Sequence, residues 1–412
     1  MPKKADNNLL VGLDIGTSKV IAIVAEVLAD GKLDILGVGS QPSKGMKKGI
    51  VVNIDAVVQC LQRAVEEAEL MSGCQIHSVY TGIAGSHIRS YNSQGVVAIA
   101  SGRVTPLDIT SVINAAKAIA IPVDQKVLHV IPQEFIIDNQ AGILDPLDMS
   151  GVRLEARVHV ITAAVSVAQN IVNSVRRLNL EVDDVVLEQV ASGMAVLSAD
   201  EKSLGVCMID IGGGSTDIAV YIDGYIAHTF TLPVAGDQVT NDLSVALRTP
   251  TTSAELIKIR HGVAICALAD PNHTLDINVV GFDDPVRINQ CDLANVIEPR
   301  FAELFSLINN ELQRKNLLNS LGTGVVLTGG SSKIMGLVTL AQKIFATNVR
   351  LGTIKGIAGQ PDIVNNPVYA TSIGLLLWGQ KMLNEQRTLK PVSSARVGRI
   401  FGRIVNWFQG NF

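Results

Sequence analysis

A glycine-rich turn near the middle of the chain constrains the fold more than any other stretch. Residues 207–211 are apolar except for Asp210, three glycines follow at 212–214, and Ser215 and Thr216 precede a second apolar run. This pattern predicts two strands whose turn lets a ligand approach the backbone closely, because glycine has no Cβ. Consecutive N–H groups bind anions, and Asp210 can hold a magnesium-bound water. The loop therefore suits a nucleoside triphosphate with its metal, with an ordinary glycine-rich hairpin as the alternative.

A second copy of this pattern lies near the N-terminus. Residues 9–15 form an apolar run that contains Asp14, and a further apolar run begins at residue 20. The residues between the two runs are Gly16, Thr17, Ser18 and Lys19. Two copies of one phosphate-binding hairpin, about half the chain apart, predict two similar domains that face each other with the nucleotide between them.

The paired hairpins resemble the two phosphate motifs of the actin, sugar-kinase and heat-shock-70 ATPase superfamily. Residues 188–196 and 369–377 are similar to its first and second connecting helices, and residues 325–336 to its adenosine motif. With both ends of the chain included, the sequence most resembles the FtsA family of bacterial cell-division proteins. The resemblance implies an α/β actin-like ATPase fold, with two RNase-H-like domains around a nucleotide cleft, an inserted small domain and a C-terminal amphipathic helix.

The same resemblance divides the chain into domains. The first core domain is expected at 1–85 and 160–195, and the second at 196–226 and 305–383. The other predicted parts are an inserted small α+β domain at 86–159, a small domain at 227–304, a flexible linker at 384–395 and a membrane-targeting helix at 396–412.

The resemblance also assigns residues to the nucleotide. Glu188 is a candidate for orienting water near the γ-phosphate, acting with Asp14 and Asp210, and the alternative is a carboxylate that stabilises a helix start. Glu255 and Lys258 are expected beside the ribose and adenine, and the alternative is a surface ion pair. The other candidate binding residues are Gly212, Gly213, Gly214, Gly236, Gly329, Gly330 and Ser331. ATP and magnesium are the expected cofactors, and hydrolysis is expected to be slow at most.

Composition excludes several other classes. The net charge of −4 argues against nucleic acid as a main partner. The five cysteines are scattered without a C-x-x-C pair, which argues against disulfides and zinc and favours a reducing compartment. Although 47% of the residues are hydrophobic, no apolar run approaches the roughly 20 residues of a membrane span. The apolar excess is therefore expected in buried strands and their covering helices.

The C-terminal segment has the pattern of a helix that lies in a membrane surface. At about 100° per residue, the apolar side chains of 396–412 share one face and the arginines lie opposite. Docking of this helix on the protein's own core is the alternative. The residues expected to contact anionic lipid are Arg396, Arg399, Ile400, Phe401, Arg403, Ile404, Trp407 and Phe408.

The resemblance further implies protein partners. The small domain at 227–304 is expected to receive the C-terminal peptide of FtsZ, and Arg287 and Arg300 are basic groups that suit an acidic peptide. Self-association into a polymer and contact of the inserted domain with later division proteins are also expected. These partners place the chain at the cytoplasmic face of the bacterial inner membrane, at the division septum.

Three rival functions share this superfamily. A small-molecule kinase needs an acceptor pocket and a catalytic Asp near the γ-phosphate, and no motif supplies them. A related pilus-assembly protein shares the inserted domain, but the arginine-aromatic tail argues against it. A heat-shock-70 chaperone carries a long substrate-binding region after the ATPase, which is not expected here.

Overall fold

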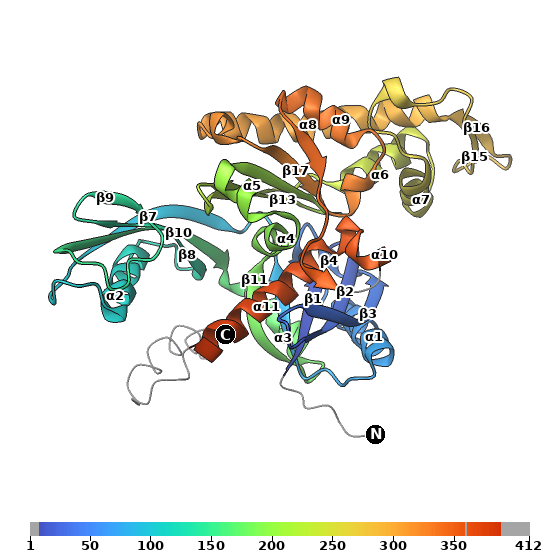
Figure 1. The fold of residues 1–412 in the computed structure, drawn as a ribbon. Coiled ribbons are helices and arrows are strands. Elements are labelled where there is room, and N and C mark those ends of the chain that lie inside the picture. The colour runs from blue at the N-terminus through green and yellow to red at the C-terminus, as the bar shows by residue number, and fades with distance from the viewer. Residues whose placement is uncertain (1–7, 359–360, 389–412) are drawn as a thin grey trace.

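The computed structural model describes residues 8–358 and 361–388. Figure 1 shows two sheet-containing halves, one above the other, and a smaller unit that projects to one side. The predicted membrane helix at 396–412 lies outside the described residues, as do residues 389–395 of the predicted linker. Within the described ranges, no helix combines the length and the apolar character needed to cross a membrane.

The first half is built on a six-stranded sheet in the order β11-β6-β1-β2-β3-β19. Strands β1, β2 and β3 are antiparallel neighbours, whereas β6 lies parallel to β1 and β11 parallel to β6. The strands are β1 (Leu9–Ile15), β2 (Lys19–Val27), β3 (Leu33–Pro42), β6 (Ser78–Ile83), β11 (Glu181–Leu187) and β19 (Ile357–Ala358). A two-stranded hairpin, β4 (Met46–Lys47) with β5 (Ile50–Val51), follows β3.

Helices cover both faces of this sheet. Gly39 pairs across β2 and β1 with Ala22 and Leu13, and a Cβ on Gly39 would lie 1.9 Å from a carbonyl of α1 (Ile54–Ser72). Gly12 precedes Leu13 in β1 and therefore faces the opposite side of the sheet, because successive strand residues alternate faces. A Cβ there would lie 2.5 Å from the Ser372 carbonyl of α11 (Ala370–Thr388). Because these glycines have no Cβ, one helix can approach each face of the sheet closely. Helix α3 (Val165–Arg176) packs beside α1.

The second half repeats the same hairpin arrangement. Its five-stranded sheet has the order β14-β13-β12-β17-β18, with β12, β13 and β14 antiparallel and β17 parallel to β12. The strands are β12 (Val206–Ile211), β13 (Thr216–Ile222), β14 (Tyr225–Leu232), β17 (Gly324–Thr328) and β18 (Val349–Leu351). The repeated topology confirms the prediction of two similar halves.

A separate apolar core holds the second half together. Phe301 and Phe305 of the long helix α8 (Gln290–Arg314) are fully buried, and the ring of Phe305 lies 5.5 Å from that of Phe345. The remaining elements here are α6 (Gly236–Ala246), α7 (Thr251–His261), β15 (Thr274–Ile277), β16 (Val286–Asn289) and α9 (Leu337–Phe345). Short helices α5 (Ala199–Leu204) and α10 (Pro361–Val364) lie outside this core.

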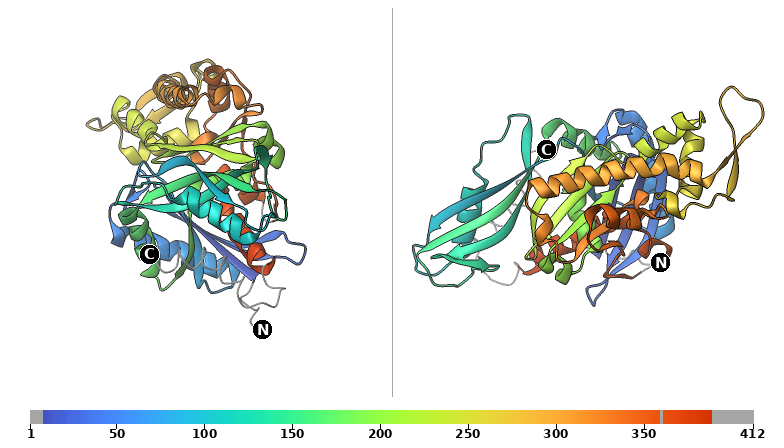
Figure 2. Two further views of the ribbon diagram at one scale, coloured as in Figure 1. Left: turned by 90° about the vertical axis from the view of Figure 1, so that its left-hand side faces the viewer. Right: turned by 90° about the horizontal axis from the view of Figure 1, so that it is seen from above.

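The projecting unit, called the insert below, comprises β7, α2, β8, β9 and β10. Its sheet has the order β7-β10-β8-β9, and α2 packs on it through buried Val112 and Ala116. Figure 2 shows the insert extending away from both halves. The bounds are β7 (Arg89–Ala98), α2 (Pro106–Lys117), β8 (Gln125–Ile137), β9 (Gln140–Ile143) and β10 (Arg153–Ala164).

Two predicted boundaries and one domain assignment differ from the structure. The boundary at 226/227 falls inside β14, which pairs with β13 and so extends the second sheet to Leu232. Helix α11, expected within the second core domain, packs instead in the core of the first half, through Ile373, Leu375 and Leu376. The same helix continues to Thr388, so the first residues of the predicted linker at 384–395 are helical.

Candidate functional site

The two glycine-rich hairpins lie directly against each other. A Cβ on Gly213 would be 2.8 Å from the Cβ of Ser18, and one on Gly214 would be 2.6 Å from Oγ1 of Thr17. The turn between β1 and β2 belongs to the first half and the turn between β12 and β13 to the second. The candidate site therefore lies where the two halves meet, and its glycines are needed because a side chain would push the hairpins apart.

Four carboxylates gather behind these turns. Asp14 is the last but one residue of β1, and Asp210 is the last but one of β12. Asp217 of β13 pairs with Asp210 across the hairpin. The fourth, Glu188, is the first residue of α4 (Glu188–Val196). Asp210 accepts hydrogen bonds from the hydroxyls of Ser192 (2.5 Å) and Thr371 (3.2 Å), so α4 and α11 both contact it.

The carboxylates raise one another's pKa values. Burial, followed by the charge of Asp210, raises the pKa of Asp14 to about 7. Burial is also the main cause for Asp217, whose pKa is raised to about 7, and for Glu188, whose pKa lies well above its usual range. Removing a carboxylate from water disfavours its charged form, and a neighbouring negative charge adds to this. A bound cation would relieve both effects, so the donor set fits a hydrated magnesium ion.

Buried polar atoms near this cluster also lack partners. The hydroxyl of Thr328 and the side-chain amide of Gln189 have no hydrogen-bond partner among the described residues. Thr328 pairs with Asp210 between β17 and β12, and Gln189 follows Glu188. Buried polar groups are normally satisfied, so these atoms fit a site that holds water or a polar ligand. No cluster of three or more His, Cys, Asp or Glu side chains in the described ranges is placed to ligate a metal directly.

The predicted adenosine motif joins the second hairpin. The hydroxyl of Ser331 donates to the Gly212 carbonyl at 2.9 Å, and a Cβ on Gly329 would be 2.3 Å from Oδ1 of Asp210. A Cβ on Gly236 would lie 2.4 Å from the Ser331 hydroxyl. Gly330 opens the short turn Gly330–Lys333 beside them. These contacts place residues far apart in sequence around one site.

Glu255 and Lys258 complete this side of the site. The buried Lys258 ammonium donates to the Gly236 carbonyl (3.0 Å) and the Thr240 hydroxyl (2.8 Å) and pairs with Glu255 at 2.6 Å. Its three donors are therefore used inside the protein, so Lys258 holds the Gly236 turn in place. Glu255, with a side chain that is 34% exposed, is the member of the pair that a ligand can reach.

Several predicted side chains are used differently from the expectation. The Thr216 hydroxyl is fully buried and donates to the Val234 carbonyl at 2.7 Å, and the Ser215 hydroxyl donates to Asp217 at 3.0 Å. Both hydroxyls thus stabilise the hairpin. At the first hairpin, Thr17 accepts a hydrogen bond from the Gly49 N–H at 3.1 Å, while Lys19 is exposed.

The two arginines predicted for partner contact are both ion-paired. Arg287 lies 3.0 Å from Asp276 on the neighbouring strand, and Arg300 lies 2.6 Å from Asp242 and also contacts Glu303. Arg287 remains the more accessible, with 71% of its side chain exposed against 30% for Arg300.

Comparison with known proteins identifies the family. The family model described as "Cell division protein FtsA" matches residues 207–374, and the model "SHS2 domain inserted in FTSA" matches residues 85–162. The cell division protein FtsA of Pseudomonas aeruginosa is 51% identical over 417 aligned positions that cover all of both chains. The chain belongs to the FtsA family.

Other members of the FtsA family agree with this match. FtsA of Escherichia coli (strain K12) is 44% identical over the whole of both chains, and FtsA of Neisseria meningitidis is 46% identical over 97% of this chain and 98% of its own. The SHS2 match coincides with the insert, so the expectation of an FtsA-type inserted domain is confirmed.

Solved structures confirm the actin-like ATPase fold expected for an FtsA protein. The PilM–PilN complex of type IV pilus biogenesis superposes with a TM-score of 0.66 at 18% identity, covering 90% of this chain and 98% of that chain. MreB5 of Spiroplasma citri bound to ADP superposes with a TM-score of 0.57 at 15% identity, covering 93% and 99%. At these identities the likeness concerns the fold.

Proposed function

We propose that this FtsA-family chain binds ATP and magnesium between its two glycine-rich hairpins. The observation that carries the proposal is the direct approach of Gly213 and Gly214 to Ser18 and Thr17 beside a cluster of buried carboxylates. Backbone N–H groups of such turns bind phosphate oxygens, because no side chain blocks them. Magnesium, when bound, neutralises phosphate charge and orders water. Asp14 and Asp210 are the residues that would hold its water ligands.

Nucleotide-bound relatives of the same fold support this proposal. The MreB5 structures that superpose on this chain were solved with ADP and with AMPPNP. In the present chain, Gly212, Gly236 and Gly329 bring three backbone segments to one place, as an adenosine with its phosphates requires. Glu255 provides an accessible acceptor for ribose or adenine groups. Glu188 is the residue that would orient water near the γ-phosphate, and hydrolysis is slow.

The nucleotide acts mainly as a switch for conformation and self-association. Membership of the FtsA family supports a role in cell division. In this role the chain polymerises and anchors FtsZ filaments to the cytoplasmic face of the inner membrane. The small domain around α7 and α8 receives the FtsZ C-terminal peptide, the insert contacts later division proteins, and residues 396–412 bind anionic lipid. Many weak lipid contacts in one polymer give firm attachment.

The rival functions receive less support. The likeness to the pilus protein PilM is at 18% identity, whereas the FtsA relatives reach 51% over the full chain. A small-molecule kinase would require an acceptor pocket beside the hairpins, and the family match gives no reason to expect one.

Nucleotide binding is tested by titrating the full chain with a fluorescent ATP analogue and magnesium. Gly236→Val is expected to abolish binding, because its side chain would meet Ser331 and Gly212. Gly73→Asn is the matched control: Gly73 ends α1 with a φ of 68°, where Asn is tolerated and no atom lies within 4 Å. Both variants are first checked for folding by thermal unfolding. A folded Gly236→Val variant that binds like the parent would contradict the proposed site.

Membrane attachment is tested by flotation with liposomes that contain anionic lipid, with and without ATP and magnesium. The full chain is compared with a chain that ends at Ala395. Flotation of the full chain only, with filaments seen by electron microscopy in that fraction, supports the tether. Equal behaviour of the two chains would rule out the C-terminal segment as the anchor.

A further inference from the structure

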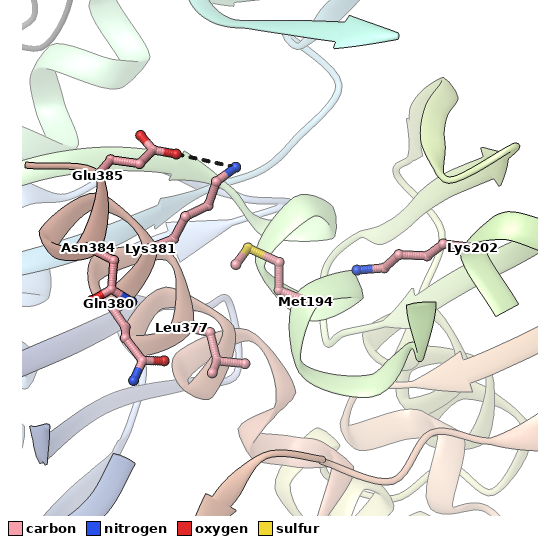
Figure 3. Close-up of a pocket in the computed structure, with 7 residues that line it drawn as sticks. All are labelled: Met194, Lys202, Leu377, Gln380, Lys381, Asn384 and Glu385. Carbon is pink, nitrogen blue, oxygen red and sulfur yellow. Dashed lines mark ion pairs between the residues drawn. The ribbon is translucent and has the colours of Figure 1, made fainter. Parts of the chain in front are cut away.

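A hollow of about 470 Å³ lies away from the hairpins, between α4, α5 and α11. Its walls include Met194 of α4, Lys202 of α5, and Leu377, Lys381 and Glu385 of α11. The hollow is shallow and largely open to solvent. Figure 3 shows the two lysines entering from opposite sides, with Met194 between them.

The positive charge of this pocket is incompletely balanced. Within the described residues, the Lys202 amine forms no ion pair, and it lies 5.2 Å from the centre of the Tyr221 ring. Burial, followed by the charge of Lys381, lowers the pKa of Lys202. Lys381 is paired with Glu385 at 4.0 Å, and both side chains are 55% exposed. So long and exposed a pair contributes little stability, so Glu385 can be displaced from Lys381.

The floor of the pocket is apolar. Met194 lies between the two amines in Figure 3, and Leu377 of α11 lies below Met194 in this view. One ligand with two acidic groups, one on each side of Met194, can contact both amines. The flexible methionine side chain adapts to an apolar group between them.

We propose that this pocket binds an acidic polypeptide segment in which an apolar side chain lies between two carboxylates. The carboxylates contact Lys202 and Lys381, and the apolar side chain packs on Met194 and Leu377. In an extended segment, residues i, i+2 and i+4 point to the same side. A sequence of the form Glu-x-Leu-x-Glu therefore presents the required groups together.

The test uses the full chain and a fluorescently labelled peptide, Glu-Ser-Leu-Ser-Glu, with binding measured by anisotropy at low salt. Lys202→Gln and Lys381→Gln are each expected to weaken binding about fivefold, as loss of one partly exposed ion pair implies. Glu385→Gln is expected to tighten it about twofold, because it removes the competing carboxylate. Lys343→Gln, at an exposed lysine of α9, is the matched control and leaves binding unchanged.

Three results would overturn the proposal. The first is equal binding of the neutral peptide Gln-Ser-Leu-Ser-Gln. The second is parental affinity in both Lys202→Gln and Lys381→Gln. The third is lysine-dependent binding of inorganic phosphate without binding of the acidic peptide, which would make the pocket a small-anion site. The peptide is titrated without nucleotide, so this proposal and the proposed nucleotide site can each fail without the other.

Discussion

The Nε2 atom of His159 in the insert lies 3.0 Å from the Oγ1 atom of Thr229 in the second half. Its Nδ1 atom lies 2.6 Å from Oδ1 of Asn92, which can only accept a hydrogen bond. Nδ1 therefore carries the proton, and Nε2 accepts from the Thr229 hydroxyl. Burial, and then the charge of His228, lowers the pKa of His159 to about 3. A neutral imidazole thus joins the insert to the second half, although the insert is continuous in sequence with the first.

Removal of the Thr229 hydroxyl is expected to weaken this connection. Thr229→Val leaves the buried Nε2 atom without a donor, which costs about 1–2 kcal/mol. Urea unfolding should show this loss. Thr274→Val, at an exposed strand position, is the matched control and is expected to change stability by less than about 0.5 kcal/mol. Equal stability of the two variants would show that the His159 contact contributes nothing.

Asp14 should make the folded chain less stable as pH rises. Its pKa is raised from 3.8 to about 7, so the folded chain binds more protons than the unfolded chain between these values. The contribution of Asp14 to stability is therefore fully present below about pH 4 and is lost as pH rises to about 7. In the absence of magnesium and nucleotide, Asp14→Asn should be about 1–3 kcal/mol more stable than the parent at pH 8, with little difference at pH 4.

The comparison of Asp14→Asn with the parent cancels the titration of histidines, which is common to both. Asp223→Asn is the control, because Asp223 is exposed with a φ of 53° that Asn adopts readily. Urea unfolding at several pH values measures the difference. If the difference in unfolding free energy between the parent and Asp14→Asn is the same at every pH, the raised pKa of Asp14 is contradicted.

Magnesium and ATP are expected to make the parent more stable than Asp14→Asn. A ligand that binds only the folded chain stabilises it by RT ln(1 + [L]/Kd), or about 2.7 kcal/mol at one hundred times Kd. The parent should gain this stability, and Asp14→Asn should gain much less because it lacks the carboxylate that would order the metal's water. Thermal unfolding across a range of ATP concentrations, with and without magnesium, measures the gain. The same gain in both proteins would remove Asp14 from the metal site.

The hairpins could be predicted from sequence because glycine, Asp and hydroxyl residues occur there in a fixed local order. Asp217 was missed, although its pairing opposite Asp210 follows from a tight turn at residues 212–215. The position of α11 could not be predicted, since its contacts with β1 and α4 join segments far apart in the chain. The internal use of Thr216 and Lys258 also depends on such distant partners, the Val234 and Gly236 carbonyls.

Close packing of α4 on α11 depends on Gly374. A Cβ at this position would lie 1.9 Å from the Ala191 carbonyl, closer than atoms can approach. Gly374→Ala must therefore move the helices apart, at a cost of about 1–3 kcal/mol. Gly330→Ala is the control, because its nearest neighbour would be a Val368 methyl at 3.7 Å. If urea unfolding shows the same loss of stability in Gly374→Ala and Gly330→Ala, α11 can shift without strain.

The pocket between α4 and α11 is expected to communicate with the hairpin site. The same two helices hold Asp210, through Ser192 of α4 and Thr371 of α11. When ATP and magnesium bind, the metal's water ligands should compete for the Asp210 carboxylate. The contacts of Asp210 with α4 and α11 should then change, and both helices should move. Because binding free energies are reciprocal, ATP and the acidic peptide should alter each other's affinity by the same factor, about fivefold or more.

Thr371→Val separates this coupling from binding itself. The variant lacks the hydroxyl that contacts both Asp210 and Ser192, yet it leaves Lys202 and Lys381 in place. We expect parental affinity for the peptide without nucleotide, and a smaller change in that affinity when ATP and magnesium are added. Anisotropy titrations under both conditions measure the factor, and titration of ATP with and without peptide checks its reciprocity. If the parent shows no change in peptide affinity on adding saturating ATP, α4 and α11 do not transmit the state of one site to the other.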